Sequence, residues 1–275
     1  MTVSTDNAVS PVEATGERRS TRELVVAVFF GPVSEAVALA FASLRVPPPA
    51  LVLANAAAGI VAAVALGAGS LILAALLLQL KTLLDNADGR LARVSGRVTL
   101  LGRYLDTEAD LAVNVLLFAA LGYVTGEPLL AFAAFCALTL VLSVNFNVAE
   151  LYRESRGESA EAPEPSGARM ERALARIYRT LHAPQDHLIR AVSAARLAAV
   201  LRDEQDPVNR RTATIAYHDR LVVTVLANLG LSTQLVVLGI CLVLGTPVLY
   251  LWLVLASLAL LPVLQVRREW SAERR

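Results

Sequence analysis

Residues 85–110 read DNADGRLARVSGRVTLLGRYLDTEAD. This stretch holds four aspartates, at positions 85, 88, 106 and 110, inside a chain that is otherwise rich in Leu, Val and Ala. A carboxylate inside a lipid bilayer costs several kcal/mol unless it is paired, protonated or bound to a cation, so each of the four is expected to have a function. The apolar segments on either side of the stretch decide the fold, and the aspartates locate the candidate site.

The composition is that of a membrane protein. Hydrophobic residues make up 56% of the 275 residues and the mean hydropathy is +0.56, above the range of soluble domains. Segments 46–80 and 221–266 contain no charged residue, and Glu127 is the one charge in 111–149. Turn residues near the middle of each segment predict three helical hairpins with arms of roughly 20 residues. We therefore predict an all-α membrane protein with six transmembrane helices, at 49–66, 71–94, 99–122, 128–149, 220–243 and 247–265.

The basic residues indicate the orientation in the membrane. Lys and Arg stand outside the three predicted turns, and cytoplasmic segments of membrane proteins are enriched in them. The protein is expected in the cytoplasmic membrane, with the aspartates and both termini on the cytoplasmic side. The formal net charge of +1 gives no reason to expect a nucleic-acid partner.

The remaining segments differ from the predicted spans. Apolar residues near the N-terminus are interrupted by Gly31, Pro32 and Glu35, which suits an interfacial amphipathic helix better than a seventh span. Apolar residues at helical spacing and many arginines predict amphipathic helices in 169–201, on the membrane or packed on the protein. The predicted parts are a disordered tail (1–20), the interfacial helix (21–45), the six-helix domain (46–266, with cytoplasmic segment 150–219) and a cytoplasmic tail (267–275).

The spacing of the aspartates predicts a metal site. Asp85 and Asp88 are three residues apart and Asp106 and Asp110 are four apart, so each pair shares one face of its helix. Both pairs lie at matching depth on adjacent helices. Carboxylates brought together need a counter-ion, and oxygen ligands without clustered His or Cys favour Mg²⁺ or Mn²⁺. Because Mg²⁺ commonly bridges carboxylates and phosphates, we expect a substrate that carries phosphate.

Residues between the aspartates agree with a phosphate ligand. Gly89 and Ala92 leave room beside the helix backbone, and Gly102 does the same one turn before Asp106. Arg93 offers a planar cation suited to phosphate oxygens. The alternative is that the two glycines serve close helix packing, as small residues often do in membranes.

The eight fixed positions also resemble a family signature. They stand in the pattern D-x2-D-G-x2-A-R-x8-G-x3-D-x3-D, which is similar to that of the CDP-alcohol phosphotransferases (CDP-alcohol phosphatidyltransferases). The resemblance implies an enzyme of phospholipid biosynthesis that moves a phosphatidyl group from a CDP-linked donor, CDP-diacylglycerol, to an acceptor hydroxyl and releases CMP. It also implies two divalent ions and allows a homodimer.

Site roles follow from the same resemblance. Asp85, Asp88, Asp106 and Asp110 would surround the metals, and Asp110 would also be the general base. A second set would line the nucleotide site: Asp88, Gly89, Ala92, Arg93 and Gly102. One departure concerns the first span, where "PPPALVLAN" at 47–55 lacks a Pro-Asn-x-x-Thr-like segment and Asn55 is shifted in position.

The acceptor is less well defined by the sequence. The motif ends DTEADL, without the Pro and Lys of many glycerophosphate-using relatives. Arg97, Arg103, Arg153 and Arg220 stand at cytoplasmic helix ends, as acceptor-binding cations or as membrane anchors. A polyol phosphate such as inositol phosphate is favoured, with glycerol phosphate, serine or another small alcohol as alternatives.

Two other classes of protein use aspartates in membranes. Intramembrane prenyltransferases bind Mg²⁺-diphosphate with aspartate clusters, but on helices well separated in sequence. A divalent-cation transporter would explain the aspartates, yet Arg93 beside a cation path is unfavourable. Neither alternative explains the glycines and Arg93 between the two pairs.

Overall fold

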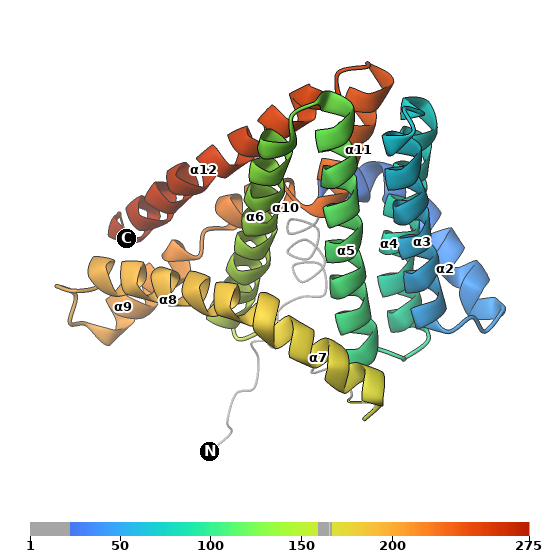
Figure 1. Cartoon of the computed structure of the whole chain (residues 1–275). Helices are drawn as coiled ribbons and strands as arrows, with labels where there is room; N and C mark the ends of the chain where they lie inside the picture. The colour runs from blue at the N-terminus through green and yellow to red at the C-terminus, as the bar shows by residue number, and fades with distance from the viewer. Residues whose placement is uncertain (1–22, 159–164, 166, 275) are drawn as a thin grey trace.

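The computed structural model describes residues 23–158, 165 and 167–274 (Figure 1). The predicted disordered tail, residues 1–20, lies outside this part. The described residues form helices and no strands, which confirms the all-α prediction. The elements are η1 (Val26–Phe30), α2 (Gly31–Ser43), α3 (Pro48–Gly67), α4 (Leu71–Val94), α5 (Leu100–Thr125), α6 (Pro128–Ser155), α7 (Arg169–Leu181), α8 (Ala183–Val200), α9 (Pro207–Tyr217), α10 (Arg220–Ala227), α11 (Leu231–Val243) and α12 (Pro247–Glu273).

Three short turns join the long helices into the predicted hairpins. Each turn contains a glycine with positive φ, at Gly69, Gly126 and Gly245, where a side chain would be strained. Prolines begin α6 and α12 directly after two of these turns, because the first turn of a helix does not need the missing N–H. The sequence therefore fixes where each hairpin reverses.

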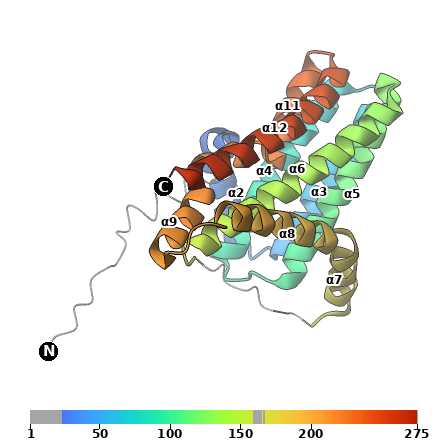
Figure 2. The same cartoon turned by 90° about the vertical axis from the view of Figure 1, so that its left-hand side faces the viewer.

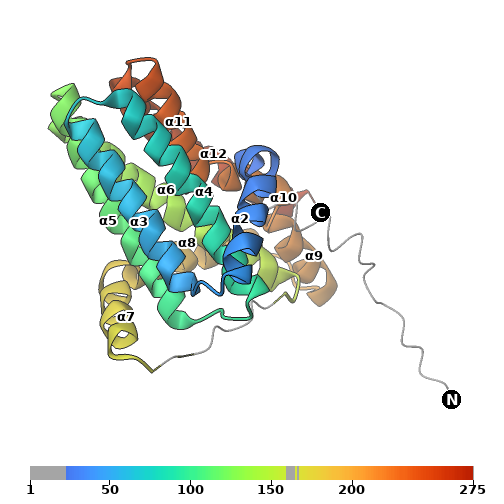
Figure 3. The same ribbon diagram turned by 90° about the vertical axis from the view of Figure 1, so that its right-hand side faces the viewer.

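The hairpins pack side by side, with their turns at one end of the molecule (Figures 1 and 3). The main apolar core lies between them, around fully buried Leu66, Leu78, Leu121 and Leu251. Helices α7 and α8 lie across the opposite end (Figure 2). The three turns therefore lie at one end of the bundle. At the other end lie α7 and α8, residues 169–200, which we call the helical insertion.

Within the described residues, six stretches are long and apolar enough to cross a membrane, so the chain is an integral membrane protein. Five of them overlap predicted spans, whereas the sixth is Val26–Ser43, which lies in the segment predicted as an interfacial helix. Helix α4 is not among the six because it carries three charged residues, Lys81, Asp85 and Asp88, within its apolar part. It nevertheless packs between α3 and α11, and its 24 residues extend about 36 Å.

The predicted span 220–243 is not one continuous helix, which corrects the sequence interpretation. It breaks at Asn228–Gly230 into α10 and α11. The Asn228 carboxamide accepts a hydrogen bond from the Leu24 amide (2.8 Å). Glu23 accepts hydrogen bonds from both the amide (2.7 Å) and the hydroxyl (2.9 Å) of Thr233, in the first turn of α11. The break thus anchors the residues that precede η1.

Candidate active site

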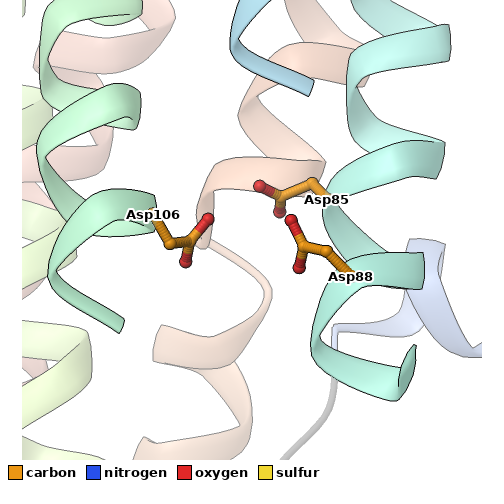
Figure 4. Close-up of side chains that lie close together, drawn as sticks. All are labelled: Asp85, Asp88 and Asp106. Atoms are coloured by element: carbon orange, nitrogen blue, oxygen red, sulfur yellow. The ribbon is translucent and has the colours of Figure 1, made fainter. Parts of the chain in front are cut away.

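Three of the four aspartates converge between α4 and α5. Asp85 and Asp88 project from α4 towards Asp106 on α5 (Figure 4), and one oxygen of each lies within 4.8 Å of the others. Asp88 Oδ2 and Asp106 Oδ1 are buried and have no hydrogen-bond partner. Buried, unpartnered carboxylate oxygens from several side chains are the donor set that Mg²⁺ or Mn²⁺ requires. The arrangement therefore fits a divalent cation.

Asp110 lies outside this group of three and pairs with a lysine. Lys81 Nζ, fully buried on α4, is 2.6 Å from Asp110 Oδ1 and 3.8 Å from Asp85 Oδ1. The motif does not include Lys81, so the sequence pattern missed it. The available signal was that it is the one lysine in the chain, four residues before Asp85 in an apolar helix. Lys81 links the two helices that supply the aspartates.

The first span also reaches the site, through Asn55 of α3. Its side-chain amide donates a hydrogen bond to Asp85 Oδ1 (2.9 Å), while its own Oδ1 is buried without a partner. The shifted asparagine of the sequence motif is thus in contact with the aspartate group.

The predicted nucleotide-site residues lie around the ends of α4 and α5 nearest the loop that joins them. The guanidinium of Arg93 lies over Gly89, where an added Cβ would be 3.6 Å from Nη1. Ala92 is half-buried, one turn beyond Asp88. The Gly102 amide donates a hydrogen bond to Thr99 Oγ1 (3.1 Å), which begins α5. These residues therefore border the aspartates. The space beside Gly89 is next to the Arg93 guanidinium and not to a neighbouring helix.

A pocket of ≈ 300 Å³ opens beside Asp106 and Asp110. Arg103 lines this pocket, and its guanidinium lies 5.6 Å from the centre of the Phe146 ring. The other three arginines considered as acceptor ligands, Arg97, Arg153 and Arg220, do not line it. Arg153 instead pairs with Glu150 (3.2 Å) on the same helix.

The helical insertion contributes three side chains to the same pocket: Tyr178, His182 and Asp186. The Tyr178 hydroxyl donates to Asp186 Oδ2 (2.8 Å). Burial and the adjacent Asp186 carboxylate raise the pKa of Tyr178 to about 12, so its hydroxyl stays protonated at neutral pH. The sequence interpretation assigned no role to these residues, which lie on two helices, with Tyr178 in α7, Asp186 in α8 and His182 at their junction.

The comparison with known families agrees with this geometry. Residues 45–179 match the CDP-alcohol phosphatidyltransferase family. This part of the chain is similar to that family, as the motif predicted. The matched region contains α3 to α6 with all four aspartates, and it ends inside α7. Members are transferases of phosphate-containing groups.

One curated relative and the solved structures complete the comparison. A Thermococcus kodakarensis protein described as a bifunctional IPC transferase and DIPP synthase is 40% identical over 79 residues. The aligned part is 28% of this chain and 18% of that protein, so it spans less than a fifth of the relative. No solved structure matches the chain significantly. Helices α8 to α12 lie beyond the part of the chain that matches the family.

Proposed function

We propose that the protein transfers a phosphatidyl group from CDP-diacylglycerol to the hydroxyl of a small acceptor and releases CMP. The observation that carries the proposal is the convergence of Asp85, Asp88 and Asp106, with buried unpartnered oxygens, beside a pocket that reaches Asp110. The family match over residues 45–179 supports the reaction class. The membrane-embedded fold suits a donor whose acyl chains stay in the bilayer.

The three converging aspartates are proposed to hold two divalent ions, Mg²⁺ or Mn²⁺, with Asp110 close by. When bound, such ions neutralise the diphosphate and stabilise the departing CMP. Gly89, Ala92, Arg93 and Gly102, together with Asp88, would border the cytidine diphosphate. The Arg93 guanidinium can donate paired hydrogen bonds to phosphate oxygens.

Asp110 is proposed as the general base. The acceptor oxygen forms a bond to the β-phosphorus as the bond from that phosphorus to the bridging oxygen breaks, and CMP leaves with the bridging oxygen. The proton of the acceptor hydroxyl passes to Asp110. Lys81 already bonds Oδ1 of Asp110, so Oδ2 is the oxygen for this proton, and Lys81 holds the carboxylate in place.

The favoured acceptor is a polyol phosphate such as inositol phosphate. Arg103 supplies a cation in the pocket beside Asp110, and hydroxyl and amide side chains supply neutral hydrogen-bonding groups around it. The name of the Thermococcus relative includes a transferase and a synthase activity. The alignment is too short to assign either activity to this chain.

The test is CMP release by the purified protein. CDP-diacylglycerol would be incubated with Mg²⁺ or Mn²⁺ and, in separate reactions, inositol phosphate, glycerol phosphate, inositol or serine. We expect CMP and a new lipid, identified by mass spectrometry, only when the ion and a suitable acceptor are both present. A lack of CMP release with every acceptor would refute the transfer reaction.

The cytoplasmic side of the cell membrane is proposed for this site, because α7 and α8 carry many arginines and lie at the end of the bundle nearer the aspartates. A water-soluble acceptor would then enter from the cytosol.

A further inference from the structure

The helical insertion lies directly over the candidate acceptor pocket. Helix α7 packs against α5 and α8 packs against α6 (Figures 1 and 2). Most of this insertion lies beyond the region that matches the family, which ends at residue 179. A role for it must therefore come from its contacts in this chain.

A hydrogen-bond network fixes the insertion to the membrane helix α6. Asp186 Oδ1 accepts hydrogen bonds from the Asn147 amide (2.7 Å) and the Ser143 hydroxyl (3.4 Å). Arg190 Nε donates to Asn147 Oδ1 (3.2 Å), and the Arg190 guanidinium also pairs with Glu154 (3.0 Å). Because Tyr178 donates to the second oxygen of Asp186, one carboxylate connects α6, α7 and α8. This wall of the pocket is held in one position.

His182 leaves hydrogen-bonding capacity unused beside that network. Its Nε2 is buried without a partner and lies 3.8 Å from Glu108 Oε1, which is also buried without a partner. This separation is too long for a hydrogen bond. The His182 ring stacks on Tyr178, with 5.4 Å between ring centres. His182 lines the pocket whereas Glu108 does not, so a ligand hydroxyl in the pocket would give the imidazole the hydrogen bond that it lacks.

The chemistry of the pocket fits a ligand with several hydroxyls and one anionic group. Arg103 is the charged donor of the lining, and Asp106, Asp110 and Asp186 are its carboxylates. Tyr178, Ser143 and Thr139 add hydroxyls, and His182 adds an imidazole. A volume of ≈ 300 Å³ is at the lower limit of small-molecule sites. Glycerol phosphate has fewer hydroxyls than inositol phosphate, so once one hydroxyl serves as the nucleophile it can make fewer hydrogen bonds to the wall.

We propose that α7 and α8 form the specificity wall of the acceptor pocket, in which His182 and Tyr178 contact the ring hydroxyls of a polyol phosphate and Asp186 positions them. The inference rests on the proposed transferase function. It gives the Arg-rich insertion a function that is separate from the metal site, and it makes the wall a determinant of which acceptor is used.

The test compares two acceptors in the full-length protein. In His182→Gln and Tyr178→Phe, we expect the KM for inositol phosphate to rise roughly tenfold, the effect of losing about one hydrogen bond. The KM for glycerol phosphate and for CDP-diacylglycerol should stay within about twofold of wild type. Asp203→Asn, at an exposed position in the turn after α8, and Tyr123→Phe, at the far end of α5, are the matched controls.

The outcomes separate the two proposals. Absence of CMP release by the wild type with all acceptors refutes the transferase function and, with it, this inference. An active wild type whose variants change both acceptors equally, or neither, refutes the specificity wall alone. Calorimetric titration of inositol phosphate without donor gives a second readout, in which weaker binding by His182→Gln but not by Asp203→Asn supports the wall and equal binding contradicts it.

Discussion

Lys81 and Asp110 form a buried ion pair between α4 and α5, with 2.6 Å between Nζ and Oδ1. The motif predicted Asp110 but not its partner, because the motif begins at Asp85 and Lys81 lies four residues before it. Likewise, the spacing predicted that Asp85 and Asp88 share a face, whereas their distance from Asp106 depends on how the helices pack. The sequence therefore predicted which carboxylates belong to the site, and the packing of the helices shows which three of them converge.

Lys81→Met should destabilise the protein by about 3–5 kcal/mol, because it leaves the Asp110 carboxylate buried without its cation. Adding Asp110→Asn should recover much of this loss, since the double variant buries neither charge. Apparent melting temperatures in detergent for both single variants and the double variant measure the coupling. A double variant destabilised by the sum of the two single effects would show that the pair does not interact.

Asp110→Asn should lower CMP release at least about 100-fold, within the range for loss of a general base. The amide keeps the size of the carboxylate but cannot take the acceptor proton. Binding of CDP-diacylglycerol should be largely retained, as measured by titration of the purified variant. Asp203→Asn is the control for an exposed aspartate, and undiminished turnover in Asp110→Asn would remove this residue from the chemistry.

At the scale of helices, the predicted hairpins are confirmed because glycine and proline mark the turns in the sequence itself. The break between α10 and α11 was not predicted, because it depends on Glu23 and Leu24, more than 200 residues away in the chain. Helix α4 shows the opposite case: its buried charges, Lys81 and Asp88, separate it from the apolar stretches although it packs inside the bundle. Local glycine and proline signals thus predicted where the hairpin helices end. The break between α10 and α11 depends on contacts with residues far away in the sequence.

Gly59 lets α3 pack closely on the helices that carry the aspartates. A Cβ added there would lie 2.5 Å from a methyl group of Val113 and 3.1 Å from Cδ of Lys81. Gly59→Ala should therefore lower the melting temperature by the equivalent of about 1–3 kcal/mol and reduce CMP release, because overpacking displaces Lys81.

Gly67→Ala is the matched control at the end of the same helix, where the nearest atom is 4.0 Å from an added Cβ. It should be neutral or slightly stabilising, since alanine favours helix. Equal effects of the two substitutions on melting temperature would show that close approach at Gly59 is unimportant.

At the scale of the whole molecule, the three hairpin turns and the α4–α5 loop should face opposite sides of the membrane. In a background with both cysteines replaced by alanine, Ser70→Cys should react with a membrane-impermeant maleimide on intact cells. Arg97→Cys should react only after permeabilisation, because arginine-rich ends are cytoplasmic. Labelling of both positions from the same side would overturn the predicted topology.

The central claim is that Asp85, Asp88 and Asp106 form a divalent-cation site for a nucleotide diphosphate. The most direct measurement is calorimetric titration of Mn²⁺ into the purified protein, with and without CDP. We predict uptake that CDP strengthens, and affinity at least about tenfold weaker in Asp88→Asn, since even outer-shell changes at metal sites have effects of that size. Glu127→Gln should bind like the wild type. Equal Mn²⁺ uptake by the wild type and Asp88→Asn, or uptake indifferent to CDP, would contradict the claim.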